Sequence, residues 1–451
     1  MSLKFINTYD YFHHINDFPK YSLKEVLLTG QAPHKGLYVP EKLIQYSSNL
    51  IKGLKGKSYP EIAFEVLYPY FDEIPKEDFK QIIFNTYKDI KAPIKELYPN
   101  IFALELFHNW TFAFKDFAAQ LLASVIEYYL KKENKKIIIF VGTSGDTGPA
   151  IDEAFYNKKN IKVYCLYPKG RVTDTQRKQM TTLGNNIFPI EVDGDFHDCQ
   201  EMAKSALDDD ELKKLNPTSA NSINWGRFIP QSVFSFWLYS QIATSDEEIV
   251  VSIPTGNAGH IGSNFLADKS IGGLPITHFV APHNENNYLV RMLEEGKTEV
   301  DVFDTIDCLS NAMNVKKPNN IPRILYIFKN DIKKMQTRIS PVTINDEETA
   351  DIIKKVYKEK NYILDVHSAV ALAGTFKFLE ENPQYKETKI GVFFTADPAK
   401  FSEKIEKILG FKPPIPEKLQ KKLATPDAKV YELSAHDMTG LKNIVFETSE
   451  E

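Results

Sequence analysis

The chain has 451 residues, of which 43% are hydrophobic and 25% are charged, and its formal net charge is −5. A chain of this length and composition is expected to form two or three globular domains and is not intrinsically disordered. The slightly acidic balance gives no electrostatic reason to expect a nucleic-acid partner.

No stretch of about 18 apolar residues occurs, and the first residues lack the apolar core of a signal peptide. Cys165, Cys199 and Cys308 are odd in number and widely spaced, which indicates neither a disulfide framework nor a metal site. We therefore expect a cytoplasmic protein in a reducing compartment, with no membrane partner and no metal.

Residues 1–95 are predicted to be mainly helical, with Gly/Pro breaks such as "TGQAPHKGLYVPEKL". From residue 96 the pattern changes to strands that alternate with helices. Predicted strands open or fill the stretches "KKIIIFVGTSGDTG", "IKVYCLYP", "NIFPIEV", "EEIVVSIPTG", "ITHFVAP" and "KIGVFF". Predicted helices lie in "VTDTQRKQMTTLG", "FHDCQEMAKSALDDDELKKL" and "DEETADIIKKVYKEKNYILD". No element is assigned between residues 300 and 345.

This alternation is typical of parallel βαβ units, which pack as open sheets covered on both faces. We predict an α/β fold of two open, mostly parallel domains, at residues 96–235 and 236–451, with a cleft between them. The helical region 1–95 precedes these domains.

One lysine stands out in the stretch "LFHNWTFAFKDFAAQLL", residues 106–122, where Lys115 lies among aromatic side chains. Burying an ammonium group is costly unless the group is paired or neutralised. One interpretation is an ordinary lysine paired with Asp116, and the other is a lysine that forms a Schiff base.

Two Gly-rich turns, "GTSGDTG" at 142–148 and "PTGNAGHIG" at 254–262, each follow a predicted strand and precede a predicted helix. Backbone N–H groups at such a turn form an anion site. Neither turn matches a P-loop or a dinucleotide fingerprint, and each could be an ordinary tight turn. Together with Lys115, they suggest pyridoxal phosphate, which needs a lysine, a phosphate nest and a partner for its ring nitrogen.

The blocks "FHNWTFAFKDFAAQ", "TSGDTG", "YPKGRVTDTQRKQM", "DGDFHDCQ", "TSANSINWGRFIPQ", "PTGNAGHIG" and "TADPAKF" resemble threonine synthase, in the same order along the chain. The stretch "YSLKEVLLTGQAPHKGLYVPE" also looks like the opening of that family. The resemblance extends from about residue 20 to 410. It implies a fold-type-II pyridoxal-phosphate enzyme, similar to the tryptophan synthase β subunit, with the cofactor in the cleft between the domains.

The implied activity is that of a carbon–oxygen lyase of threonine biosynthesis, which converts O-phospho-L-homoserine and water to L-threonine and phosphate. By matched position, Lys115 would hold the cofactor, Thr395 would bond its ring nitrogen, and Asp146 would lie near its 3′ oxygen. The cofactor phosphate would be bound by the loop of Gly256, Asn257, Ala258, Gly259 and His260.

The resemblance also implies a substrate site. The "TSGDTG" loop would seat the substrate carboxylate through Ser144 and Thr147, and Thr143 is expected to bind substrate as well. Arg227 is the candidate for the substrate phosphate by residue type, with a structural salt bridge as the alternative, and Lys169 and Arg171 are further candidates.

Two histidines, His108 and His367, match family positions, and each is interpreted as a buried, hydrogen-bonded structural residue. The sequence departs from the family at three places. It has Asn109-Trp110 where the family usually has Gly-Pro, His260 where the family usually has Asn, and Asp397 where the family often has His. The first departure places strict specificity for phosphohomoserine in question. The histidine N–H at the second could replace an amide N–H.

Two rival functions stay open at this point. A related phospholyase would eliminate phosphate without adding water and would yield 2-oxobutyrate and ammonia. A non-catalytic binding protein with the same fold is disfavoured by the intact Lys115, glycine loop and Thr395. The expected partner is a small-molecule substrate, and the chain is expected to be a monomer or a homodimer.

Overall fold

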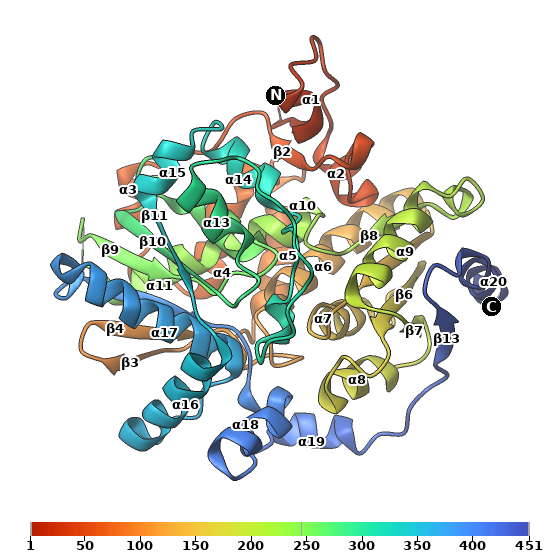
Figure 1. The fold of residues 1–451 in the computed structure, drawn as a ribbon. Helices are drawn as coiled ribbons and strands as arrows, with labels where there is room; N and C mark the ends of the chain where they lie inside the picture. Colours follow the sequence, from red (N-terminus) through yellow and green to blue (C-terminus); the bar gives the residue numbers. More distant parts are fainter. Residues whose placement is uncertain (1, 245, 450–451) are drawn as a thin grey trace.

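The computed structural model describes residues 2–244 and 246–449, and it confirms an α/β architecture with two mostly parallel sheets. A six-stranded sheet has the order β11-β10-β9-β12-β4-β3, and a five-stranded sheet has the order β13-β7-β6-β5-β8. The two sheets lie in different halves of the molecule, with helices packed around each (Figure 1). Within the described ranges, no helix is both long and apolar enough to cross a membrane.

The N-terminal region is mainly helical, as predicted, and also contains one short strand pair. Its elements are β1 (Phe5–Asn7), α1 (Thr8–Phe12), α2 (Leu23–Thr29), β2 (Tyr38–Pro40), α3 (Ser48–Lys52), α4 (Tyr59–Leu67) and α5 (Lys76–Tyr87). The starts of α2 and α4 are specified locally by capping boxes, Ser22 with Glu25 and Ser58 with Glu61.

The five-stranded sheet is entirely parallel and is covered on both faces. Its elements are β5 (Ile137–Gly142), β6 (Ile161–Pro168), β7 (Ile187–Asp193), β8 (Pro217–Ser219) and β13 (Tyr431–Ser434), with helices α6 (Lys115–Glu133), α7 (Thr147–Phe155), α8 (Asp174–Thr181) and α9 (Phe196–Asp208). Alternate residues of β5 enter different cores. Ile137 and Ile139 pack in the main core with α6 and α7, whereas Ile138 and Phe140 pack in the core beside α9. Burial on both faces explains the unbroken apolar run of this strand.

The six-stranded sheet is parallel except for β3, which pairs with β4 in an antiparallel hairpin. Its strands are β3 (Ile94–Tyr98), β4 (Ile101–Glu105), β9 (Ile249–Ser252), β10 (Ile276–His283), β11 (Ile339–Thr343) and β12 (Lys389–Phe394). The helices between β8 and the C-terminal segment are α10 (Trp225–Phe228), α11 (Val233–Ile242), α12 (Gly259–Asn264), α13 (Tyr288–Glu295), α14 (Ile321–Ile327), α15 (Ile332–Arg338), α16 (Asp346–Lys360), α17 (Val366–Glu381) and α18 (Ser402–Leu409). The unassigned stretch 300–345 thus contains α14, α15 and β11.

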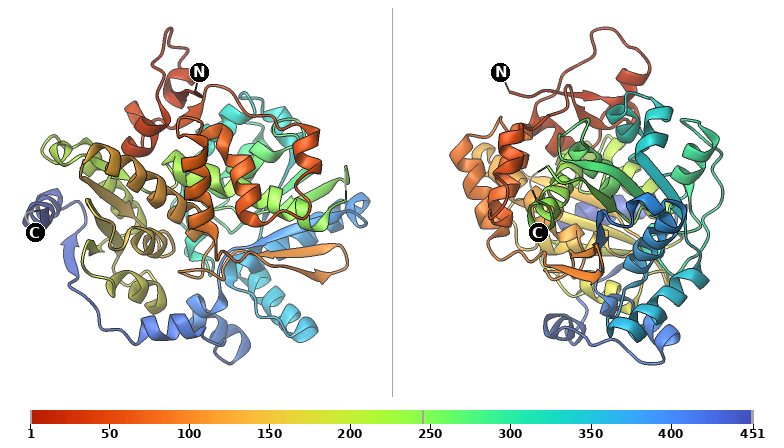
Figure 2. Two further views of the ribbon diagram at one scale, coloured as in Figure 1. Left: turned by 180° about the vertical axis from the view of Figure 1, so that it is seen from behind. Right: turned by 90° about the vertical axis from the view of Figure 1, so that its left-hand side faces the viewer.

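The sheets divide the chain differently from the predicted ranges at two places. β4 pairs with β12, so the strand just before Lys115 belongs to the sheet of the C-terminal half. After α18 and α19 (Glu417–Leu423), the chain passes around the molecule to β13, which pairs with β7, and to α20 (Met438–Ser449) (Figure 2). Hairpin pairing and this long return connection are tertiary features that strand and helix patterns along the chain do not contain.

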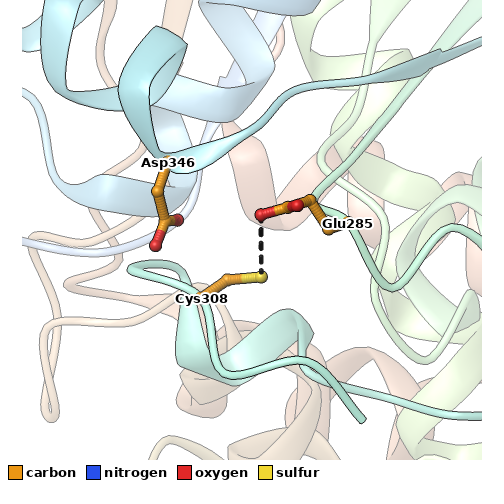
Figure 3. A group of neighbouring side chains, drawn as sticks. All are labelled: Glu285, Cys308 and Asp346. Atoms are coloured by element: carbon orange, nitrogen blue, oxygen red, sulfur yellow. Dashed lines mark hydrogen bonds between the residues drawn. The ribbon is translucent and has the colours of Figure 1, made fainter. Parts of the chain in front are cut away.

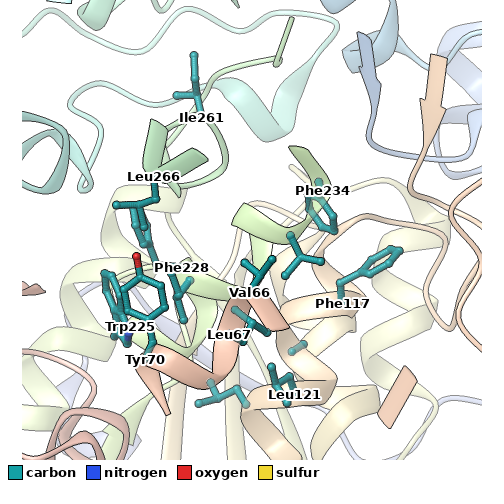
Figure 4. Packing of buried hydrophobic residues seen from close by; sticks show 14 of the residues in the cluster. Val66, Leu67, Tyr70, Phe117, Leu121, Trp225, Phe228, Phe234, Ile261 and Leu266 are labelled. Atoms are coloured by element: carbon teal, nitrogen blue, oxygen red, sulfur yellow. The ribbon is translucent and has the colours of Figure 1, made fainter. Parts of the chain in front are cut away.

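The N-terminal helices complete the core between the two sheets. Val66, Leu67 and Tyr70, at the end of α4 and just beyond it, pack in one cluster with residues of α6, α10 and α12 (Figure 4). Phe117 of α6 packs edge-to-face on Phe234 of α11, with ring centroids 5.0 Å apart. This shared core anchors the first turn of α6, where Lys115 lies.

Candidate active site

The predicted site residues converge on one cavity at the carboxyl ends of strands from both sheets. This is where open α/β sheets bind ligands. The cavity is lined by Lys115, Ser144, Asp146, Thr147, Arg227, Gly256, Asn257, Ala258, Gly259, His260 and Thr395, among others. Thr143 lies outside this lining. Its hydroxyl oxygen accepts the N–H groups of Gly145 and Gly148, so it shapes the loop from beneath.

Lys115 is the first residue of α6, and the turn before it is tied to the other sheet. Phe112 adopts φ 60°, and the Phe114 N–H donates to the Thr395 carbonyl oxygen at 2.9 Å. The Lys115 Nζ lies 3.7 Å from Asp146 Oδ2, and 17% of its side chain is exposed. Burial lowers the pKa of this amine, and the neighbouring Lys400 and Arg227 lower it further against the attraction of Asp146.

Asp116 is not the partner of Lys115, so the interpretation of Lys115 as an ordinary lysine paired with Asp116 is wrong. Its carboxylate is fully buried and accepts both the N–H and the hydroxyl of Thr111. Burial raises the pKa of Asp116 to about 7, against those two hydrogen bonds. Asp116 thus stabilises the turn before Lys115 through Thr111, and the carboxylate that faces the Lys115 amine is that of Asp146.

Asp146 lies between two lysines. Its Oδ1 accepts Gln176 Nε2 at 3.0 Å and pairs with Lys400 Nζ at 3.2 Å, while its Oδ2 faces Lys115. Burial opposes ionisation of this carboxyl, but Lys400 and Lys115 together hold its pKa well below the usual range. The cavity therefore contains a fixed carboxylate beside the lysine amine.

The glycine loop 256–259 presents the start of α12 to the cavity. Ala258 adopts φ 55°, and the first hydrogen bond of α12 runs from the Gly262 N–H to the Ala258 carbonyl oxygen. The N–H groups of the first helical turn therefore have no carbonyl partner within the helix. The Asn257 side chain faces outward from this turn, donating to Ser222 Oγ and accepting the Asn319 N–H, and so it braces the loop.

His260, where the family usually has Asn, lies on the cavity wall with its ring stacked on Phe114 at 4.5 Å between centroids. The side chain is buried, and neither ring nitrogen has a hydrogen-bond partner in the described part of the chain. Burial, with the charge of Lys115, lowers the pKa of His260 to about 3, so the imidazole is neutral. One ring nitrogen of this neutral imidazole carries an N–H.

Arg227 is buried like a structural residue, but its guanidinium lacks the hydrogen-bond and ion-pair partners that a structural arginine usually has in the described part of the chain. Its side chain lines the cavity, its Nη1 donates to the Ala220 carbonyl oxygen at 2.6 Å, and its buried Nε has no acceptor. Within residues 2–244 and 246–449, no carboxylate forms a salt bridge with it, and burial lowers its pKa to about 10 against the attraction of Asp116. The salt-bridge alternative is therefore not observed: in the described part of the chain the guanidinium lines the cavity without an ion pair, and Asp116 attracts it only through space.

The other predicted cations lie elsewhere. Lys169 Nζ pairs with Glu432 at 3.1 Å and Glu191 at 3.6 Å on the surface. Arg171 lines an adjoining outer cavity of about 840 Å³, which shares Ser144, Phe196 and Gln200 with the inner one. The outer cavity therefore adjoins the inner one.

The histidines match their predicted structural role in part. His367 is buried, and its Nδ1 lies 2.9 Å from Asp365 while its Nε2 accepts the Ala312 N–H, yet its ring also lines the cavity. His108 bonds Glu105 at 2.6 Å, but 36% of its side chain is exposed, so it is not the buried residue we expected.

The remaining family departures do not contact the cavity. Asn109 bonds the backbone of Lys91 through both ends of its amide, Trp110 is exposed, and Asp397 accepts the Ala399 N–H. None of the three belongs to the lining residues.

Among the residues at the site that were not predicted, two hold other site residues in place. Lys400 is fully buried beside Asp146, and Asn320 donates from Nδ2 to the Asn257 carbonyl oxygen at 3.1 Å, bracing the glycine loop. Lys400 belongs to the same "TADPAKF" block as Thr395, so this block could have indicated that Lys400 lies near the site. Asn320 lies in the unassigned stretch and had no such signal.

A separate group of metal-type ligands, Glu285, Cys308 and Asp346, lies outside the cavity (Figure 3). Their ligand atoms lie within 4.8 Å of one another, but Glu285 is exposed and Asp346 accepts the Leu309 N–H. The Asn286 amide lies 3.6 Å from the Cys308 sulfur. These groups are engaged by the protein itself, and we assign no metal to them.

Comparison with known proteins shows which family the chain resembles. Residues 87–396 match the family model of pyridoxal-phosphate-dependent enzymes, and residues 10–87 match that of the threonine synthase N terminus. The chain is 37% identical to the threonine synthase of Haemophilus influenzae, over 89% of this chain and 91% of that protein. It is 34% identical to the Escherichia coli K12 enzyme, over 90% and 92%.

Solved structures agree with the sequence relatives. The crystal structure of threonine synthase from Escherichia coli matches with a TM-score of 0.89 and 32% identity, covering 99% of this chain and all of that chain. The pyridoxal-phosphate-bound threonine synthase from Brucella melitensis matches with a TM-score of 0.89 and 29% identity, covering the whole of both chains.

Proposed function

The chain belongs to the threonine synthase family of pyridoxal-phosphate-dependent enzymes, and on this premise we propose that it converts O-phospho-L-homoserine and water to L-threonine and inorganic phosphate. The observation that carries this proposal is a single cavity that contains a buried lysine amine, a glycine loop for one phosphate and a separate, unpaired arginine for another. A substrate and a cofactor that each carry a phosphate need two such anion sites.

The residues present fit the cofactor. Lys115 would carry it, the loop of Gly256 to Gly259 with His260 would hold its phosphate, and Thr395 would face its ring nitrogen. The unpartnered ring nitrogens of His260 support this assignment, because buried polar atoms rarely lack partners in a complete site. The loop also packs too closely for a side chain at Gly256, since its Cβ would lie 2.8 Å from Met313 Cα.

When bound, the cofactor supplies an electron sink for negative charge that develops at the substrate Cα and Cβ. Lys115 is placed to move protons at these two carbons, because burial lowers its pKa and so favours the free amine. Ser144 and Thr147, at the start of α7, would orient the substrate carboxylate, and Asp146 keeps a fixed negative charge beside the amine.

Arg227 would bind the substrate phosphate. A phosphate dianion there would satisfy the free Nε and supply the missing counter-ion to the guanidinium, which can grip two oxygens at once. The outer cavity, with Arg171 on its wall, would be the route by which substrate enters and phosphate leaves.

The function is tested by incubating the protein with O-phosphohomoserine and measuring phosphate and threonine together. Equal amounts of both are expected. Phosphate with 2-oxobutyrate and ammonia would instead identify the phospholyase. Neither product, with no absorbance of bound cofactor, would indicate a non-catalytic binding protein.

Substituting Arg227 with Gln should lower kcat/KM by about 10- to 150-fold, because a charged hydrogen bond contributes roughly 1.5–3 kcal/mol. The absorbance spectrum and cofactor affinity should stay intact, since the cofactor phosphate has its own site. Steady-state kinetics and a cofactor titration measure the two effects. Loss of cofactor would assign Arg227 to the other phosphate, and a lower melting temperature with normal kinetics would assign it a structural role.

Substituting Gly256 with Ala should weaken cofactor binding by about 5- to 150-fold, because overpacking a filled space costs about 1–3 kcal/mol. The added methyl group would press on the Met313 backbone, which cannot move aside like a side-chain end. The control is Gly53→Ala, at the exposed end of α3, which should leave the affinity unchanged. A cofactor titration with normal affinity in Gly256→Ala would contradict the proposed phosphate loop.

We propose a cytoplasmic location and a monomer or homodimer. The location is supported by Cys165, Cys199 and Cys308, which are all free and buried. Sedimentation velocity at several protein concentrations would distinguish the two assemblies.

A further inference from the structure

A second lysine of the cavity region, Lys400, has no role in the proposed function. It lies between β12 and α18, and its side chain reaches across to the five-stranded sheet, where Asp146 follows β5. Its fractional exposure is 0%. Because a buried ammonium group is costly, its partners indicate what it is for.

All three donors of Lys400 have acceptors. Its Nζ donates to the Thr111 carbonyl oxygen and to Gln179 Oε1, both at 2.9 Å, and lies 3.2 Å from Asp146 Oδ1. Two of these acceptors are neutral, so Asp146 supplies the counter-charge. Gln179 Nε2 in turn donates to the Thr111 carbonyl oxygen, which fixes the amide orientation.

The carboxylate of Asp146 thus faces two lysines that differ in burial and in distance. Its Oδ1 bonds Gln176 and Lys400, whereas its Oδ2 lies 3.7 Å from the amine of Lys115. If Asp146 had no other cation, its charge would stabilise Lys115 as an ammonium, which is not a nucleophile.

We propose that Lys400 is a positioning residue that neutralises and orients Asp146, so that Lys115 exists as an uncharged amine able to take the cofactor. This inference rests on the proposed role of Lys115 in carrying the cofactor. Lys400 acts through its ion pair with Asp146, in addition to the repulsion of its own charge on Lys115, and does not itself touch the reacting atoms.

The other charged and titratable groups around Lys115 agree with this assignment. Arg227 adds positive charge, and His260 is neutral, so neither stabilises an ammonium at Lys115. Asp116 is committed to Thr111. Around Asp146, His367 and Lys404 contribute through space without an ion pair to it.

The test measures the acidity of Lys115 in the full chain freed of cofactor by dialysis. Competitive labelling with trace isotopic acetic anhydride across pH, followed by peptide mapping, gives the midpoint at which each lysine amine becomes reactive. Lys400→Met and Lys400→Gln should both raise the Lys115 midpoint by about one pH unit, a tenfold loss of reactivity below it. Surface lysines in the same sample provide internal references.

The matched control is Lys404→Met. Lys404 is a partly buried lysine four residues away that donates to Leu309 and Asn311, so its removal deletes a nearby cation without breaking the pair with Asp146. It should shift the midpoint much less. In an Asp146→Asn background, Lys400→Met should produce a clearly smaller shift than in the parent.

Asp146→Asn alone keeps Lys400 in place and should lower the Lys115 midpoint, a result that does not depend on whether Lys400 variants fold. An unchanged midpoint in folded Lys400→Met and Lys400→Gln overturns the proposal, as does an equal shift in the Asp146→Asn background or a raised midpoint in Asp146→Asn. Because the labelling reports the amine without cofactor, a cofactor link found on another lysine would overturn the proposed function and leave this measurement valid.

Discussion

Lys115→Ala is expected to abolish turnover, with kcat at least about 10⁴-fold lower. Proton transfer by a positioned group contributes about 10²- to 10⁴-fold, and the substitution also removes the covalent link to the cofactor. Lys115 lies on the wall of the cavity, and within the described ranges the other cavity-lining cation is an arginine, which does not form such a link. Release of phosphate from O-phosphohomoserine measures the effect.

The position of the link is checked independently of activity. Borohydride reduction of the cofactor-loaded parent, followed by peptide mapping, should place the label on the peptide that contains Lys115. Lys115→Arg keeps a cation at the position and should be as inactive as Lys115→Ala, because a guanidinium neither forms the link nor accepts a proton. A label on another peptide, or turnover that survives in Lys115→Ala, would remove Lys115 from its role.

Thr395→Asp is expected to keep cofactor binding but to lower kcat by about 100-fold or more, the scale seen when a preorganised electrostatic group is altered. Thr395 follows β12 directly, and its N–H donates to Ser368 Oγ at 3.1 Å, which orients the residue at the cavity wall. A neutral hydroxyl beside the ring nitrogen leaves that nitrogen unprotonated, whereas a carboxylate in the same place favours the protonated form. That change alters how much charge the ring accepts.

Thr395→Ser is the matched control, because it retains the hydroxyl and should keep most of the activity. Cofactor affinity and kcat must be measured on the same preparations. An unchanged kcat in Thr395→Asp would show that residue 395 does not control the ring nitrogen. Loss of cofactor in both variants would indicate a packing role at the end of β12 instead.

Several features of the fold and the site could be predicted from sequence because they depend on residues close together in the chain. The unbroken apolar run of β5 predicts a strand buried on both faces, and both of its faces enter cores. The turn at Gly256 and the aromatic block around Lys115 are each formed by residues that lie within about ten positions of one another, so each can be recognised in the sequence. The family resemblance then placed Thr395 in the same site, although 280 positions separate it from Lys115.

The sequence by itself therefore determined the α/β class, the lysine, the glycine loop and the family. Only the tertiary structure decided which groups meet. Lys115 faces Asp146 and not the adjacent Asp116, because the first turn of α6 directs Asp116 to Thr111. Among the described residues, Arg227 forms no ion pair and its Nε has no acceptor, and Lys400 reaches Asp146 from the other sheet. The physical reason is range: backbone propensity and turn geometry act between neighbours, whereas ion pairing and desolvation depend on segments that only the packing of two sheets brings together.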